Sequence, residues 1–145
     1  MAGVQLDLVA YGLDRADAVI ARLAREGDGE LMEDISVLVE NQTKERIDSE
    51  KASPSGQAWP EWSAEYAGSR HGGQSLLVAS GNLLGSIASF ASSGSAEVGS
   101  GLVYAAPHNF GSDEQGIPQR EFLGISSENE DEIRDLIVDR FEGLL

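Results

Sequence analysis

Residues 127–144 read SENEDEIRDLIVDRFEGL, and this stretch carries the clearest structural signal in the chain. Its apolar residues recur at helical spacing: Ile133, Leu136, Ile137, Phe141 and Leu144. Ser127 and Glu130 have the spacing of a capping box, in which two side chains satisfy free N–H groups at a helix start. Acidic residues come first and arginines later, as the helix dipole favours. The stretch predicts an acidic amphipathic helix.

The first third of the chain, residues 12–50, also predicts helices. Asp14 has the properties of an N-cap for a helix that Gly27 ends, and a longer helix is expected over residues 30–49. Its buried stripe consists of apolar residues at helical spacing: Leu31, Ile35, Leu38 and Val39. Residues 41–46 of that helix are polar, so we expect them to project from the core or to meet another chain. Before these helices, apolar residues alternate over residues 4–8, as in a half-buried strand.

Between the helical ends lies a centre rich in Gly and Ser, in which residues 53–125 hold two basic and six acidic residues. Residues 53–75 predict an ordered loop, because a disordered linker would not normally carry two tryptophans. Residues 76–125 predict a strand-rich region, with a short helical turn capped by Ser80 at its start. The expected strands are 86–91, 95–98 and 102–106, and Pro107 should end the last, since it has no N–H for the ladder.

Together these elements indicate an α+β protein. It would have N-terminal helices, a small antiparallel sheet with long ordered loops, and the C-terminal amphipathic helix, all in a single domain over residues 1–145. A chain of 145 residues is long enough to bury a core of its own. No stretch is apolar enough to predict a membrane span or a targeting segment.

Composition excludes several classes of function. The chain has no cysteine, which rules out disulfides, thiolate metal sites and a catalytic thiol. Its net charge of −15 argues against binding nucleic acid through basic patches. No nucleophile-elbow, phosphate-loop or dinucleotide motif occurs. The two histidines, His71 and His108, lack the spacing of metal ligands. We therefore expect no catalytic site, no cofactor and no metal.

The most unusual sequence is in the loops, and in order it resembles the virion morphogenesis or tail completion proteins of Mu-like tailed bacteriophages. The shared pieces are GxxW at 56–59, LLV at 76–78, SGNLLGSI at 80–87, VGS at 98–100, YA at 104–105, HxFG at 108–111 and PxRxFLG at 118–124, followed by the acidic helix. The resemblance covers residue 53 to the C-terminal helix. A departure follows Trp62, where the family tends to show a threonine and a basic residue and this chain has SAEY.

The resemblance implies a structural protein of the phage neck, located in the virion and assembled in the host cytoplasm. It would form a homo-oligomeric ring that completes or terminates the tail and joins it to the head connector. A hexamer is favoured because tail tubes are six-fold, and a dodecamer is the alternative if the ring abuts the portal. Its partners would be connector and tail tube proteins. DNA would pass through an acidic lumen that repels phosphates, without sequence-specific binding.

Loops with rigid aromatic and arginine residues are typical of interfaces. The interface candidates are Trp59, Trp62, Tyr104, His108, Phe110, Arg120 and Phe122. Within this set Phe110 and Phe122 are candidate anchors and Arg120 a candidate ion-pair donor. Phe122 has an alternative role as a core residue. Gly111 and Gly124 are candidates for a positive φ.

Two other functions stay open at this point. One is a capsid assembly or morphogenesis factor that is absent from the mature virion. The other is a small hydrolase that uses His108 with a nearby carboxylate, such as Asp113 or Glu114.

Overall fold

The computed structural model describes residues 4–8, 29–69, 72–92 and 95–142. Its elements in chain order are β1 (Val4–Leu8), α2 (Gly29–Glu45), the π-helical turn η1 (Arg46–Glu50), α3 (Ala64–Ser69), α4 (Asn82–Ser86), β2 (Ala88–Ala91), β3 (Ala96–Ser100), α5 (Ala105–Phe110) and α6 (Ser127–Glu142). The α+β class predicted from the sequence is therefore confirmed. The helix predicted between Asp14 and Gly27 lies outside the described residues.

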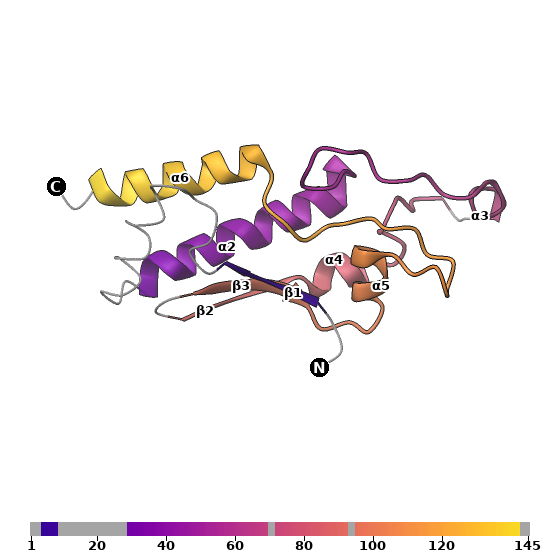
Figure 1. Ribbon diagram of the computed structural model, residues 1–145, viewed down its shortest axis with the longest axis horizontal. Helices are drawn as coiled ribbons and strands as arrows, with labels where there is room; N and C mark the ends of the chain where they lie inside the picture. Colours follow the sequence, from indigo (N-terminus) through magenta and orange to yellow (C-terminus); the bar gives the residue numbers. More distant parts are fainter. Residues whose placement is uncertain (1–3, 9–28, 70–71, 93–94, 143–145) are drawn as a thin grey trace.

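The molecule is elongated and layered (Figure 1). The sheet forms one layer, α2 lies across it, and α6 runs beside α2 on the side away from the sheet. Loops 51–81 and 101–125, with the short helices α3, α4 and α5, occupy the opposite end of the molecule from the β2–β3 turn. One end is thus built from regular elements and the other mainly from loops.

The sheet has three antiparallel strands in the order β1–β3–β2. Two of its strands, β2 and β3, match predicted strands, and β1 confirms the alternating pattern at residues 4–8. The predicted strand over 102–106 is wrong, because β1 takes that position beside β3 and the chain turns into α5. Pro107 is the third residue of α5, where a helix leaves the backbone N–H without an intrahelical partner in any case.

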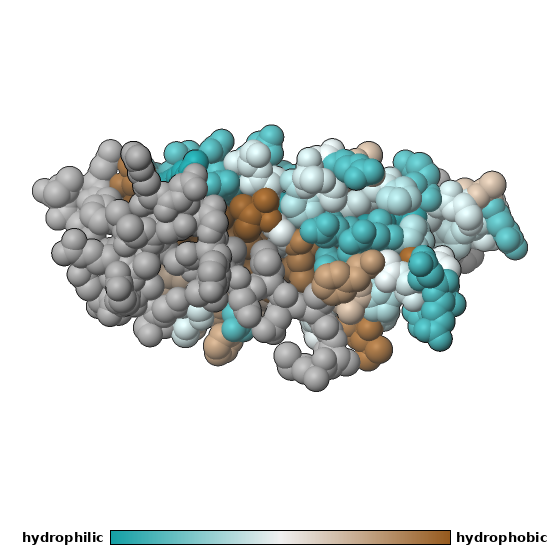
Figure 2. All heavy atoms as spheres, in the orientation of Figure 1, coloured by the Kyte–Doolittle hydropathy of each residue, from teal (hydrophilic) through white to brown (hydrophobic). Residues whose placement is uncertain are grey.

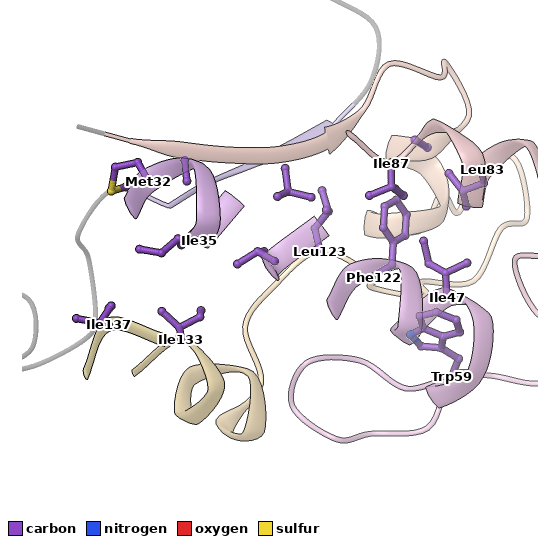
Figure 3. Packing of buried hydrophobic residues seen from close by; sticks show 14 of the residues in the cluster. Met32, Ile35, Ile47, Trp59, Leu83, Ile87, Phe122, Leu123, Ile133 and Ile137 are labelled. Carbon is purple, nitrogen blue, oxygen red and sulfur yellow. The ribbon is translucent and has the colours of Figure 1, made fainter. Parts of the chain in front are cut away.

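The core confirms the apolar stripes of the two long helices where their side chains are described; the Phe141 side chain and Leu144 lie outside the described part. Leu31, Ile35 and Val39 of α2 are at most 4% exposed, and Ile133 and Ile137 of α6 at most 5%. Figure 3 shows the α6 side chains directed toward Ile35 and Met32 of α2, and Phe122 directed into the cluster near Ile47, Leu83 and Ile87. Burying such side chains is worth about 1.5–3 kcal/mol each relative to leaving them exposed.

The polar residues 41–46, at the end of α2 and the start of η1, do not all project from the core as the sequence predicted, although Asn41 and Glu45 are exposed. Gln42 and Thr43 are buried, and Arg46 is 0% exposed. Arg46 donates from Nη1 to the carbonyls of Phe122 and Gly124, at 2.8 and 3.2 Å. Loop 122–126 therefore covers this end of α2, because its buried carbonyls need donors that only a polar helix face supplies.

The start of α6 is capped one residue earlier than the sequence predicted. The Asn129 N–H donates to Ser126 Oγ at 3.0 Å, and the Ser126 N–H donates to Asn129 Oδ1 at 3.2 Å. The same Oδ1 accepts a short hydrogen bond from Arg46 Nη2. Ser126 and Asn129 thus form the cap in place of the predicted pair, Ser127 and Glu130. Asn129 is buried, and in this position it also accepts a hydrogen bond from Arg46.

The predicted loop over 53–75 is ordered where described, although it contains α3. Trp59 fixes it, with a side chain that is 4% exposed and an Nε1 that donates to the carbonyl of Glu121 at 3.0 Å. Lys51, at the end of η1, donates from Nζ to Ser75 Oγ at 2.9 Å and to the carbonyl of Leu76 at 2.7 Å. Both ends of the loop are thus attached to the core by named side chains.

Candidate interaction site

The PxRxFLG segment at 118–124 is the centre of the loop-rich end. Asn109 of α5 accepts from the N–H groups of Phe122 and Leu123 through its Oδ1, both at 3.0 Å. The Arg120 N–H donates to the carbonyl of His108 at 2.8 Å. The segment therefore has almost no regular structure, yet its backbone has a fixed position against α5.

Beside this segment lies a pocket of about 630 Å³. Its walls come from four parts of the chain: residues 60–66, residues 75–83, α5 with the residue before it, and residues 116–120. The lining is mainly apolar and aromatic, with Trp62, Tyr66, Tyr104, Leu77 and Ile117 among its residues. Volumes of about 300–1,000 Å³ are typical of pockets that bind a compact group.

Arg120 joins two walls of the pocket. Its side chain is 7% exposed and donates from Nε to the carbonyl of Pro60 at 2.8 Å and from Nη2 to the carbonyl of Glu61 at 3.2 Å. Burial lowers the pKa of Arg120, and the nearby Glu61 opposes that shift. Within the described part of the chain Arg120 forms hydrogen bonds to carbonyls and no ion pair, so carbonyl dipoles and the nearby Glu61 carboxylate together balance its charge.

His108 stands on α5 at the same pocket, and its ring meets that of Tyr104 edge-on at 6.2 Å. Burial lowers the pKa of His108, and the positive charge of Arg120 lowers it further. Its Nδ1 is buried and has no hydrogen-bond partner among the described residues. The ring is therefore held in its neutral form, beside a cation rather than a carboxylate.

The remaining wall is shaped by a tight turn at residues 75–78. The backbones of Ser75 and Val78 exchange two hydrogen bonds of 2.9 Å, and Leu77 between them has φ +61°. A positive φ is rare for a bulky residue and is usually maintained by surrounding contacts, here including the donors from Lys51. On the opposite wall the rings of Trp62 and Tyr66 lie 5.8 Å apart.

The structure brings most of the sequence-predicted interface residues to one place. Trp62, Tyr104, His108 and Arg120 line the pocket. Phe110 lies at the end of α5 and is 64% exposed, without lining the pocket. The other two candidates, Trp59 and Phe122, are buried inside the chain and present no surface to a partner. Phe122 has the core position that was its alternative role.

Sequence reasoning missed the polar residues that build this end. Arg46 and Asn109 hold the 120–124 segment, and Lys51 holds the 75–78 turn, yet none was singled out. No local pattern marks them, because their hydrogen-bond partners across the fold lie 13 to 83 residues away in the sequence. Positive φ values at Gly111 and Gly124 confirm the two glycine predictions.

In Figure 2 the loop-rich end shows mainly hydrophilic and neutral residues, with small hydrophobic areas between them. Five described residues of this end or the adjoining sheet expose large apolar side chains: Tyr66, Phe90, Val103, Tyr104 and Phe110. Within the described ranges, no group of three or more His, Asp or Glu side chains is placed to hold a metal ion. None of the described helices is both long and apolar enough to span a membrane.

Comparison with known proteins agrees with this arrangement. The model of the phage virion morphogenesis family matches residues 12–142, which include every element from α2 to α6. No curated protein and no solved structure gives a significant match. Because the family match spans most of the sequence and the segments that form the pocket lie within it, the chain belongs to the phage virion morphogenesis family.

Proposed function

We propose that the protein is a structural component of the phage neck, where a ring of its copies completes the tail and joins it to the head connector. The observation that carries this proposal is membership of the phage virion morphogenesis family over residues 12–142. Assembly proteins of this kind act by presenting complementary surfaces. The pocket and the exposed apolar residues of the loop-rich end are such surfaces.

We further propose that the protein has no enzymatic activity. In the hydrolase alternative, His108 would need a carboxylate to orient it as a general base. Its neighbour is instead Arg120, whose charge lowers the pKa of His108. Asp113 and Glu114 are exposed to solvent, and among the described residues neither forms a hydrogen bond with Nδ1 of the ring. This arrangement favours a role for His108 in packing the pocket wall.

The ring is proposed to be cyclic, with six copies favoured and twelve as the alternative. A cyclic ring needs heterologous contacts, in which two different surfaces of each copy meet. The molecule offers two distinct ends, one formed by the sheet and the other by loops (Figure 1). A net charge of −15 would let DNA pass through the lumen without adhering to it.

The test is electron microscopy of lysates from phage with a nonsense codon early in this gene. We expect filled heads beside separate tails, because both parts assemble but do not join. Overlong tails would indicate specifically the terminator role. Missing or aberrant heads would contradict the neck proposal and favour the capsid assembly factor. Detection of the protein in purified virions separates the two further, because only a neck protein remains in the particle.

A further inference from the structure

One large apolar side chain lies far from the pocket. Phe90 of β2 is 70% exposed, although strands of a small sheet normally bury their aromatic residues. It lies on the face of the sheet away from α2, since Val98 and Ala96 on the other face are fully buried against the core. No described residue covers it, so the side chain is available to another molecule.

A carboxylate accompanies this aromatic side chain. Phe90 is paired directly with Glu97 of β3, and paired residues of antiparallel strands direct their side chains to the same face. Glu97 is half-buried and forms no ion pair within the described part of the chain. The tip of the β2–β3 hairpin therefore presents an aromatic group with a negative charge beside it.

The pocket at the other end has the complementary chemistry. Its walls carry aromatic and aliphatic groups from Trp62, Tyr104 and Leu77, and its volume of about 630 Å³ accommodates an aromatic side chain. Its cation, Arg120, is bonded only to carbonyl oxygens. The Arg120 side chain is 7% exposed at the pocket, and the nearby carboxylate of Glu61 acts on its charge.

Phe90 and Glu97 lie too far from the pocket to contact it within one molecule. In Figure 1 strand β2 lies toward one end of the long axis, and the helices α3, α4 and α5, which carry pocket residues, lie toward the other. Contact between them must therefore be made by different copies. Contact between unlike surfaces is heterologous, and repeated heterologous contacts close into a ring when the rotation between copies permits.

We propose that the β2–β3 hairpin of one copy docks on the next copy, with Phe90 in the pocket and Glu97 facing Arg120. This inference rests on the proposed ring and names the surfaces that form it. Phe90 supplies the apolar anchor of the contact. Glu97 fixes its orientation, because Arg120 forms no ion pair within the described residues and an arginine binds a carboxylate strongly when water is excluded.

Cysteine cross-linking in assembled particles tests this contact, and the chain has no cysteine of its own. Phe90→Cys is combined with Ser80→Cys or with Pro118→Cys, two pocket residues on different loops. Oxidation of joined particles should give a ladder of linked subunits that ends at the ring number. Val138→Cys replaces Phe90→Cys in the control, because Val138 is 51% exposed on α6 and should give no ladder.

Phe90→Ser gives a second readout that does not depend on disulfide geometry. We expect the number of joined particles to fall at least about tenfold relative to the unchanged gene. The thermal unfolding of the purified chain should stay the same. Val138→Ser should leave the number of joined particles unchanged. If a cysteine variant alone yields no joined particles, cells are infected at the same time with phage that carries the unchanged gene. The joined particles then contain both kinds of subunit, and linked dimers are expected in place of a full ladder.

The outcomes separate this inference from the proposed function. Joined particles that give no ladder with either pocket cysteine, or that form normally with Phe90→Ser, would overturn the hairpin contact and leave the neck role intact. A nonsense phage with normal joined particles would overturn the neck role itself. A ladder from the Val138→Cys control would show that cross-linking is unspecific and would also contradict the proposed contact.

Discussion

The two ends of this molecule are stabilised in different ways. At the sheet end, α2 and α6 bury aliphatic side chains such as Ile35 and Ile133. At the loop-rich end, polar side chains fix the backbone, as Arg46 does for the segment at 122–124. Aliphatic packing fills the space between regular elements, whereas side-chain hydrogen bonds position loops without filling all the space beside them. The pocket described above lies at the loop-rich end.

Two phenylalanines of the loop-rich end differ in their role, because one packs in the core and the other is exposed to solvent. Phe122 and Phe110 are twelve residues apart, yet the first is 0% exposed and the second 64%. The hydrogen bonds that Asn109 accepts from the N–H groups of residues 122 and 123 direct Phe122 inward. Phe110 follows Asn109 directly and, at the end of α5, points to solvent. One helix end thus provides both a core position and an exposed aromatic group.

The largest effect is expected from removing the donors that hold the loop-rich end. Arg46→Met should lower the free energy of unfolding by about 3–5 kcal/mol, since buried acceptors at Phe122, Gly124 and Asn129 lose their charged donor. Urea unfolding measures this loss. Arg46→Lys is the control, because it keeps the charge and loses the fork that reaches several acceptors. Equal stability of Arg46→Met and the unchanged chain would refute the special role given to polar contacts here.

The two phenylalanines give a matched pair. Phe122→Ala should cost about 3–5 kcal/mol, because it leaves a cavity in a packed core. Phe110→Ala should change stability by less than about 0.5 kcal/mol, since the side chain is mostly in solvent. Thermal unfolding of the two purified variants gives the comparison. If Phe110→Ala were as damaging as Phe122→Ala, the division between core and recognition surface drawn above would be wrong.

A smaller effect should follow from crowding the close contact between Gly124 and Pro54. Gly124 has φ +152°, and a Cβ at this position would collide with the Pro54 ring. Gly124→Ala should therefore destabilise the chain by about 2–3 kcal/mol.

The control for this crowding is Gly116→Ala, at a glycine that also has a positive φ but has open space around it. Its cost should be limited to backbone strain, about 1 kcal/mol. The double variant Gly124→Ala with Pro54→Ala should recover part of the lost stability. No recovery would mean that backbone conformation alone, without the steric contact, explains the cost.

The smallest expected effect is a pH dependence at His108. Its pKa in the folded chain is lowered by burial and by Arg120, so the unfolded chain binds the proton more readily. The contribution of His108 to stability is therefore full above its ordinary pKa and is lost as the pH falls through and below it. Urea midpoints between pH 8 and pH 5 should fall less steeply for His108→Gln than for the unchanged chain. Parallel curves would show that the ring is not held neutral.

Sequence patterns predicted the elements whose residues interact locally. The alternation at 4–8, the stripe of α2 and the stripe of α6 were all correct, because strand and helix periodicities leave a direct trace in the order of residues. The predicted strand over 102–106 failed because β1, almost 100 residues upstream of it, takes the place beside β3. Strand order depends on distant pairing, which a local pattern does not encode.

The interface candidates predicted from the sequence fall into two groups in the structure. The aromatic residues and Arg120 in the loops predicted an interface in these segments. Four of the seven candidates line the pocket: Trp62, Tyr104, His108 and Arg120. The sequence could not separate pocket residues from core residues, so Trp59 and Phe122 were grouped with the others. Their burial follows from the hydrogen bonds that the loops make across the fold, for example from Trp59 to Glu121.

By itself the sequence determined the α+β class, the amphipathic stripes, the absence of cysteine chemistry and the resemblance to phage morphogenesis proteins. The tertiary structure alone decided the role of Arg46, the inward position of Phe122 and the existence of the pocket. The physical reason is the range of the interactions. Periodic burial is set by neighbours three or four residues away, whereas a buried donor takes its role from whichever carbonyl the fold brings to it.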